Sequence, residues 1–312
     1  MYIIIAGGSG LIGRELISTQ VVGGHDVSIL SRNPEKVKGM PAKVQIFQWD
    51  GKTVESWVDE ISNADVIVNL AGENLSGKGL FPSRWTKQRK ELLLRSRVDA
   101  GRVLSRAIEI ADKKPAIFVQ ASGVGIYGNN RERIFSEESE IGNDFLANLS
   151  KEWEASSEPV EVLGIRRVVT RFGVVLSNKG GAFRPILFPY KFYVGGPIGD
   201  SQQVYSWIHS KDLAEAINYL IEHDHARGVF NLTSPNPATN DEFGKTIRRV
   251  YKRPHYLPIP GFLMHLAFGE VANMVLEGQR VLPEKLLDSG YIFKYPTLDE
   301  ALRNLVKNAS II

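Results

Sequence analysis

The sequence contains no cysteine among its 312 residues. Disulfides, thiol nucleophiles and cysteine-ligated metal sites are therefore excluded. No run approaches the roughly 20 apolar residues that a membrane-spanning helix needs, so we expect no membrane partner. The formal net charge of +3 is small for this length, and no basic run accompanies it. We therefore expect no nucleic-acid partner.

We also expect no export signal, because the first residues form a short apolar stretch typical of a core strand. We therefore expect a cytoplasmic protein. His223 and His225 flank an aspartate, but their spacing places the two rings on different faces of a helix, so we predict no metal site. The hydrophobic content of 43% suits one large or two ordinary globular domains.

The N-terminal stretch combines a strand, a glycine turn and a helix. Residues 2–6 are apolar and rich in β-branched side chains, which is typical of a buried strand, and a helix is predicted over 11–19. The turn between them contains Gly7, Gly8, Gly10 and Gly13. Their spacing fits G-x-G-x-x-G and also G-x-x-G-x-x-G, in which the backbone approaches a phosphate at a helix N-terminus. The pattern predicts dinucleotide binding, and a glycine turn without a ligand is the alternative.

The end of the second predicted strand, residues 27–30, bears on the choice of cofactor. NAD-dependent enzymes place an acidic residue there to bind the ribose 2′-hydroxyl. This chain has Ser31 and Arg32 instead. A guanidinium can bind the additional phosphate of NADP, and the serine can add a hydrogen bond. We therefore predict NADP(H); the alternative is an arginine in a surface loop.

Strands and helices alternate through the first part of the chain, which predicts an α/β fold with a Rossmann-type doubly wound parallel sheet. We predict an NADP(H)-binding Rossmann domain over 1–180, to which later segments return, and a smaller, mixed, largely helical substrate or cap region over 181–312. The further predicted strands cover 44–47, 64–72, 116–121 and 162–170; the helices cover 53–61, 81–112, 145–156, 211–222, 239–252, 261–276, 283–288 and 297–307; and 129–144 is predicted as a polar loop.

Short motifs lie at residues 69–74 (NLAGEN), 171–176 (RFGVVL), 195–199 (GGPIG), 206–209 (SWIH) and 278–283 (GQRVLP). With the glycine turn, the chain resembles the extended short-chain dehydrogenase/reductases, which include the nucleotide-sugar epimerases. These motifs resemble more closely an atypical branch labelled "epimerase family protein", with YfcH-like and 39U-like members. Residues from about 258 to 307 resemble the C-terminal domain of unknown function that is particular to this branch.

This resemblance implies a Rossmann fold that binds NADP(H). It places the pyrophosphate at residues 7–12, the 2′-phosphate at Ser31 and Arg32, and the nicotinamide end near Val174. Arg97 would reach the cofactor from the long helix. The cofactor-binding residues implied in this way are Gly7, Ser9, Gly10, Leu11, Ile12, Ser31, Arg32, Leu70, Ala71, Arg97 and Val174.

The chain departs from the family at its catalytic pair. Active members carry Tyr-x-x-x-Lys on the helix after the fifth strand, where the lysine and the cofactor lower the pKa of the tyrosine that acts as acid and base. Here Phe145 and Leu149 stand at those positions, and Lys151 falls on another face of the helix. The sequence therefore leaves open whether the chain is an enzyme.

Two hydroxyl groups remain as catalytic candidates. Ser122 keeps the position of the family's substrate-orienting hydroxyl, and Tyr127 lies five residues later in a glycine-flanked loop, as the candidate surrogate acid. His209 stands just before a predicted helix, where a role in packing or at the helix start is favoured over catalysis.

Two hypotheses about function remain open. In the first, the protein is an NADP(H)-dependent oxidoreductase or a nucleoside-diphosphate-sugar epimerase-like enzyme acting on an unknown small-molecule substrate. In the second, it is a catalytically inactive NADPH-binding sensor or regulator, connected with cell division as one label of the family suggests. A homodimer formed through the helices at 84–110 and 145–156 is compatible with both.

Overall fold

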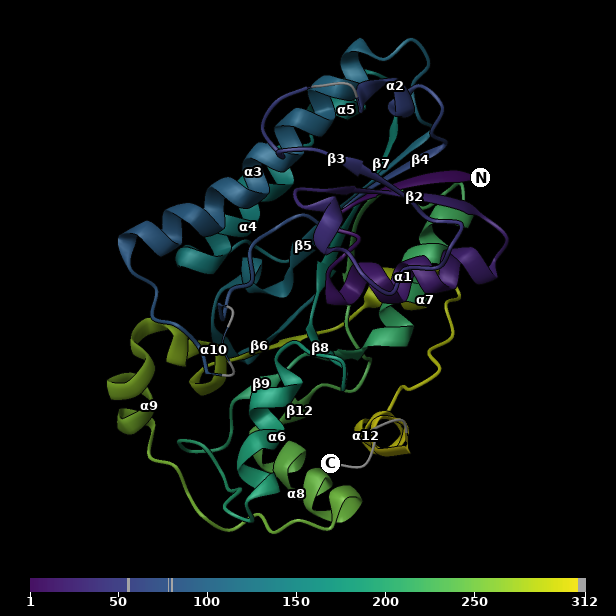
Figure 1. The fold of residues 1–312 in the computed structure, drawn as a ribbon. Helices are drawn as coiled ribbons and strands as arrows, with labels where there is room; N and C mark the ends of the chain where they lie inside the picture. Colours follow the sequence, from purple (N-terminus) through teal and green to yellow (C-terminus); the bar gives the residue numbers. More distant parts are fainter. Residues whose placement is uncertain (55–56, 78, 80, 308–312) are drawn as a thin grey trace.

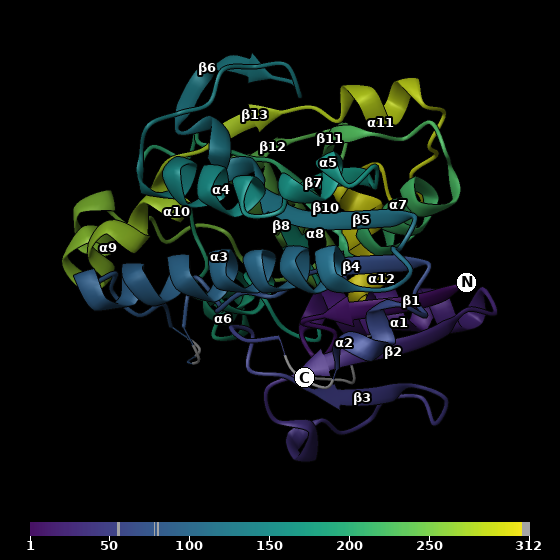
Figure 2. The ribbon, with the colours of Figure 1, turned by 90° about the horizontal axis from the view of Figure 1, so that it is seen from above.

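The computed structural model describes residues 1–54, 57–77, 79 and 81–307. Its centre is a seven-stranded sheet in the order β11-β7-β5-β4-β1-β2-β3, and neighbouring strands pair in parallel. The strands are β1 (Tyr2–Ala6), β2 (Asp26–Ser31), β3 (Gln45–Gln48), β4 (Val66–Asn69), β5 (Ile117–Gly123), β7 (Arg166–Phe172) and β11 (Gly228–Leu232). Seen from above, they step across the molecule from β3 at one edge to β11 at the other (Figure 2). The predicted doubly wound Rossmann-type fold is confirmed.

The central strands are apolar on both faces because helices cover both sides of the sheet (Figure 1). Ile3 and Ile5 of β1 pack into the core beneath α1 and α7, whereas Ile4 points to the opposite core beneath α2, α3 and α5. The helices of these layers are α1 (Leu11–Val22), α2 (Val58–Ile61), α3 (Lys87–Ile110), α4 (Phe145–Ala155), α5 (Pro159–Val162), α7 (Ser210–Glu222) and α11 (Glu284–Asp288).

The remaining elements form a smaller region beside the carboxyl ends of the strands (Figure 1). Its own core contains the fully buried Phe183 and Trp207. Its helices are α6 (Phe183–Lys191), α8 (Asn240–Tyr251), α9 (Gly261–Phe268), α10 (Asn273–Leu276) and α12 (Leu298–Lys307). Its short strands are β6 (Asn130–Phe135), β8 (Val174–Leu176), β9 (Val204–Tyr205), β10 (Trp207–His209), β12 (Ala238–Thr239) and β13 (Gln279–Val281). No helix in the described part of the chain is long and apolar enough to cross a bilayer.

The structure corrects two predicted elements around the sheet. Residues 129–144, predicted as a loop, contain β6, which pairs with β13 from much later in the chain. The strand predicted over 162–170 begins only at Arg166, because residues 159–162 form α5 and Gly164 turns the chain with φ +79°. In both cases, tertiary contacts rather than local preference decide the conformation.

Three predicted helices also have different bounds. The first, predicted over 53–61, is reduced to α2, and residues 55–56 lie outside the described residues. Before α2, the carboxylate of Asp50 stabilises a turn by accepting hydrogen bonds from the amides of Lys52 and Thr53. The long helix starts at Lys87, capped by Thr86. The helix predicted over 261–276 breaks at Gly269, where φ is +62°, into α9, a 3₁₀ turn and α10.

The junction of β10 and α7 contains a buried histidine. Nδ1 of His209 accepts a hydrogen bond from the Lys211 amide at 3.1 Å and so caps α7. Burial lowers the pKa of His209 to about 4; Lys211 and Lys294 lower it further, and a hydrogen bond with Asn304 opposes them. The folded protein therefore binds fewer protons than the unfolded chain between pH 4 and pH 6.5, and acid destabilises it in that window.

When the pH falls from 7 to 5, the unfolded chain takes up a proton at His209 that the folded protein does not. We expect this to lower the free energy of unfolding by about 2 kcal/mol. His209→Asn keeps a cap acceptor but cannot take up the proton, so its stability should fall less over this range. Asp212, whose pKa burial raises to about 6, acts in the opposite direction and is common to both proteins. Urea denaturation at pH 7, 6 and 5 measures the difference, and parallel profiles would contradict the prediction.

Candidate functional site

A cleft of about 550 Å³ follows the carboxyl ends of the central strands. One wall comes from the turn after β1, the loop after β4 and the end of β5. The opposite walls come from α4, residues 172–175 and 204–206, and residues 273–279 of the C-terminal region. Connections leave β1 and β4 in opposite directions, which makes this edge the usual ligand-binding crevice of a doubly wound sheet.

The glycine turn leaves the start of α1 open to the cleft. No side chain caps the helix, and its first turn has no acidic residue, so its first amides lack partners within the helix. A Cβ at Gly7, where φ is +79°, would lie 2.7 Å from the carbonyl carbon of Leu70. At Gly10, however, a Cβ would meet only the carbonyl oxygen of Gly7, at 3.3 Å. The turn is thus tightly packed against the loop after β4 at Gly7 and open toward the cleft at Gly10. This arrangement leaves room for a phosphate of a dinucleotide.

Arg97 of α3 forms a buried cationic wall of the cleft. Its guanidinium lies 4.9 Å from the ring centroid of Trp153 and donates to the carbonyl oxygens of Leu93 and Glu73 at 3.0 and 2.9 Å. Its Nε is buried without a hydrogen-bond partner among the described residues. Burial lowers the pKa of Arg97 to about 10, against the attraction of Glu73, so the side chain stays charged at neutral pH. A buried cation with a spare donor suits an anionic or polar ligand group.

Arg32 lies next to the cleft, at the end of β2. Its Nη2 is 3.0 Å from Oε1 of Glu73, which lines the cleft from the loop after β4. Nη1 of Arg89 is 3.9 Å from the other oxygen of that carboxylate. Because Arg97 also contacts the backbone of Glu73, three arginines converge around a single acid. This excess of positive charge is suited to a phosphate at this end of the cleft.

Ser122 brings a hydroxyl to the cleft wall at the end of β5. Its Oγ donates a hydrogen bond of 2.6 Å to Oε1 of Glu154 on α4. Arg171 of β7 holds the same carboxylate through its Nε and Nη2, at 2.8 and 2.9 Å. Burial acts to lower the pKa of Arg171, but the hydrogen bonds and charge of Glu154 outweigh it and raise that pKa. The result is a buried serine–carboxylate–guanidinium chain with the serine at its open end.

Tyr127 lies behind this chain and is only 3% exposed. Its hydroxyl donates to Oδ1 of Asn231 at 2.7 Å and accepts from Nη1 of Arg171 at 2.9 Å. Burial raises the pKa of Tyr127, although Arg171 and Asn231 partly oppose this. The phenol is therefore kept neutral and does not line the cleft in the described structure.

Comparisons with known proteins agree with this geometry. Residues 3–150 match the NAD dependent epimerase/dehydratase family, and residues 259–305 match a domain of unknown function, DUF1731. Epimerase family protein YfhF of Bacillus subtilis is 40% identical over the full length of both chains. The crystal structure of human epimerase family protein SDR39U1 with NADPH superposes with a TM-score of 0.86 at 33% identity, covering 99% of this chain and 100% of that one.

The chain belongs to the epimerase family, in its atypical short-chain dehydrogenase/reductase branch. The chain is also similar to the crystal structure of the nucleoside-diphosphate sugar epimerase from Corynebacterium glutamicum, with a TM-score of 0.75 and 29% identity, covering 98% of this chain and 58% of that one. The UDP-glucose 4-epimerase of Thermus thermophilus is 18% identical with a TM-score of 0.77, which shows the shared fold alone.

Most of the predicted site residues of this epimerase-family protein meet at the cleft. Those that line it are Gly7, Gly10, Leu11, Ile12, Leu70, Arg97, Ser122 and Val174. The others, Ser9, Ser31, Arg32, Ala71 and Tyr127, lie beside or behind it. Ser9 contributes a carbonyl to Arg14, Ser31 accepts from the Asn33 amide, and the Ala71 amide donates to Asn69. The ligand-binding and catalytic roles of all these residues stay predictions.

Sequence reasoning missed Glu154 and Glu73 as members of the site. Glu154 carries a sequence signal, because it is the one carboxylate among the buried positions of α4, which are otherwise apolar or small. Glu73 belongs to the motif at residues 69–74, but nothing in that motif indicates its pairing with Arg32, because only the folded loop brings the two side chains together. At the missing catalytic pair, Leu149 lines the cleft, whereas Phe145 packs 5.1 Å from Trp85, between ring centroids.

No group of three or more His, Asp or Glu side chains is placed to hold a metal ion within the described ranges. The expectations of a cytoplasmic location, of a homodimer, and of no membrane or nucleic-acid partner stay predictions for this epimerase-family protein.

Proposed function

We propose that this chain is an NADP(H)-dependent oxidoreductase, or an epimerase-like enzyme, acting on a small molecule with a secondary alcohol or carbonyl group. One observation carries the proposal: Ser122, whose hydroxyl donates to Glu154, lines the same cleft as the uncapped start of α1. The NADPH in the related human structure supports the choice of cofactor. The convergence of Arg32, Arg89 and Arg97 around Glu73 also supports the choice of NADP(H).

The proposed chemistry divides between cofactor and protein. NADP(H), when bound, supplies the hydride donor or acceptor. In the oxidation direction, Ser122 Oγ accepts the proton of the substrate hydroxyl while its own proton moves to Oε1 of Glu154, and the carbonyl forms as the hydride leaves the same carbon. Reduction reverses these transfers. A serine–carboxylate relay thereby takes the place of the tyrosine and lysine that this chain lacks.

Arg171 positions the relay. Its two hydrogen bonds fix the Glu154 carboxylate so that one oxygen faces Ser122, and both Ser122 and Glu154 are almost fully buried. Tyr127 supports the arrangement from behind by accepting a third hydrogen bond from Arg171. We therefore assign Tyr127 to positioning and Ser122 to contact with the substrate.

Cofactor choice is tested with Arg32→Ala. We expect the variant to bind NADPH roughly 10- to 100-fold more weakly and NADH no more weakly, because only NADPH carries the phosphate that the guanidinium would bind. The measurement is titration of each nucleotide by protein fluorescence. Arg95→Ala, which removes an exposed arginine of α3 paired with Glu91, is the matched control and should change neither affinity. Equal losses for both nucleotides would contradict the assignment of Arg32.

The relay is tested with Ser122→Ala. We expect it to lower the turnover of NADPH roughly 10²- to 10⁴-fold across a panel of aldehydes, ketones and nucleotide sugars, with NADPH affinity unchanged. Ser150→Ala, which alters another hydroxyl-bearing residue lining the cleft, should keep its turnover. Full turnover by Ser122→Ala would refute the relay. Glu154→Gln is a poorer test, because leaving Arg171 unpaired in the interior should cost about 3–5 kcal/mol of stability.

A second candidate function, an NADPH-binding sensor without redox chemistry, is favoured by α9. None of its residues is buried, and Phe262 and Leu266 are 69% and 70% exposed. Large exposed apolar side chains of this kind mark interaction surfaces. The absence of the tyrosine and lysine at Phe145 and Leu149 points the same way.

For the sensor, we expect NADPH to remain unoxidised across the whole panel while capture of a protein partner differs among the NADPH, NADP⁺ and nucleotide-free states. Phe262→Ser with Leu266→Ser should abolish that difference, whereas the exposed control Leu92→Ser on α3 should keep it. The readout is quantitative mass spectrometry of captured proteins. Capture that is identical in the three nucleotide states would exclude this function.

A further inference from the structure

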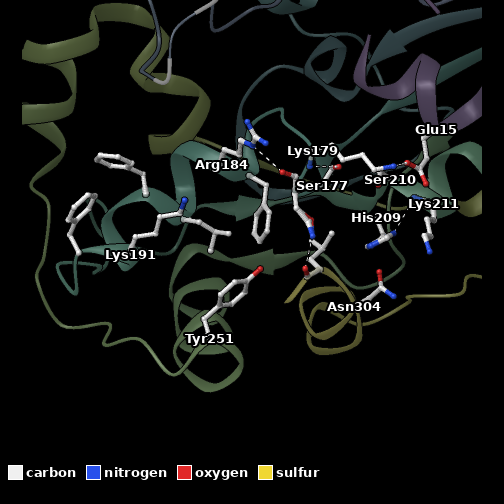
Figure 3. Close-up of a pocket in the computed structure, with 16 residues that line it drawn as sticks. Glu15, Ser177, Lys179, Arg184, Lys191, His209, Ser210, Lys211, Tyr251 and Asn304 are labelled. Carbon is white, nitrogen blue, oxygen red and sulfur yellow. Dashed lines mark hydrogen bonds and ion pairs between the residues drawn. The ribbon is translucent and has the colours of Figure 1, made fainter. Parts of the chain in front are cut away.

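A second cavity, of about 780 Å³, lies among α6, α8, α12 and the start of α7 (Figure 3). It is separate from the cofactor cleft: the two share no lining residue. The chain segment between β8 and α6 stands between them, with residues 181–182 on the cleft and residues 177–179 on the second cavity. The relay proposed above does not use this cavity.

The walls of the cavity are strongly cationic. Lys179, Arg184, Lys191 and Lys211 line it, whereas Glu15 is its one acidic lining residue. His209 also lines it, but with a pKa of about 4 it is neutral at pH 7. The cavity therefore holds three positive charges in excess, although the whole chain has a net charge of only +3. This local concentration attracts an anion.

Most of this charge is not neutralised within the protein. Lys179 forms an ion pair with Glu15, with Nζ 2.9 Å from Oε2. Arg184 donates its Nε to the carbonyl oxygen of Asn178 at 3.0 Å, which leaves the two terminal nitrogens of its guanidinium. Neither Arg184 nor Lys191 nor Lys211 forms an ion pair with any residue that the structure describes. Arg184 and Lys191 both extend from α6, whereas Lys211 lies across the cavity near Glu15 (Figure 3).

The rest of the lining is apolar and aromatic. It includes Phe183, Leu187, Phe188 and Leu305. The hydroxyl of Tyr251 points into the cavity (Figure 3) and has no hydrogen-bond partner in the described ranges. Burial raises the pKa of Tyr251, so the phenol stays neutral and can donate. The cavity thus combines cations, one hydroxyl donor and an apolar wall.

We propose that this cavity is a second ligand site, which binds a small organic anion, a phosphate or carboxylate carried on an aromatic or aliphatic body. Arg184 and Lys191 bind the anionic group, the phenylalanine wall takes the apolar body, and Tyr251 donates a hydrogen bond. Occupancy of this site is coupled to occupancy of the cofactor cleft.

The segment between the cavities provides the coupling. A Cβ at Gly181, where φ is +72°, would lie 3.0 Å from Cδ2 of Leu11, in the first turn of α1. Lys179, two residues earlier, is tied to Glu15 of the same helix. An anion bound by Arg184, whose Nε holds the carbonyl oxygen of Asn178 next to Lys179, therefore acts on the segment that packs against the start of α1. Any such coupling is reciprocal between the two ligands.

The binding test uses phenyl phosphate as the probe, with inorganic phosphate and phenol as its two fragments. The full chain is saturated with NADPH, so that the cofactor cleft is not available, and each probe is titrated by calorimetry. We expect one phenyl phosphate per chain, bound at least tenfold more tightly than either fragment. No binding, or NADPH displacing the probe one for one, would overturn the second site.

Variants locate the bound probe. Arg184→Gln and Lys191→Gln should each weaken phenyl phosphate at least fivefold, and Tyr251→Phe should weaken it about threefold. Lys43→Gln, an exposed lysine in the turn before β3, is the charge-matched control and should leave the affinity unchanged. Equal weakening by Lys43→Gln would show a general charge effect and overturn the assignment.

Coupling is measured separately, as the dissociation constant of NADPH with and without saturating phenyl phosphate. We expect a shift of at least threefold in the wild-type chain and a smaller shift in Lys179→Gln. An NADPH affinity that is independent of the probe would overturn the coupling. Because the binding test does not depend on turnover, failure of the proposed relay and failure of this site are distinguishable.

Discussion

The close contact between the glycine turn and the loop after β4 is the constraint on which the rest of the site depends. Gly7 lies against the backbone of Leu70, and Gly13 lies against Gly8, where a Cβ would be 2.5 Å from its Cα. These contacts fix where α1 starts and leave its first amides facing the cleft. The same helix start packs against Gly181 and, through Glu15, against Lys179. The cofactor cleft and the second cavity thus both border α1, the cleft at its first residues and the cavity one turn later at Glu15.

A buried polar network joins the sheet to the C-terminal region. It runs from Ser122 through Glu154, Arg171 and Tyr127 to Asn231. The Asn231 side chain then donates to the carbonyl oxygen of Leu282, next to β13, at 3.0 Å. Burying these charges is expensive unless every partner is present, so the network fixes one relative placement of its elements. A substrate touching Ser122 would therefore meet a rigid wall.

Much of the architecture could be predicted from local pattern. The strand before the glycine turn and the helix predicted over 239–252 both formed as expected, the helix opening at a capping box of Thr239 and Glu242, because each depends on residues close together in the chain. Two of the wrong predictions have different causes. β6 exists only because β13, far away in the chain, pairs with it. α9 ends before Gly269, whose φ of +62° is a local helix-ending signal, although the apolar pattern continues beyond it.

The sequence by itself determined the glycine turn, the Rossmann-type alternation, the family and the absence of the tyrosine–lysine pair. Only the tertiary structure decided which groups meet. Arg32 forms a hydrogen bond with Glu73, which is 41 residues later in the chain. Ser122 bonds to Glu154, 32 residues later. The buried Tyr127 bonds to Asn231, 104 residues later. The physical reason is that strand order and helix packing set these neighbours, whereas local patterns specify only which face of an element is buried.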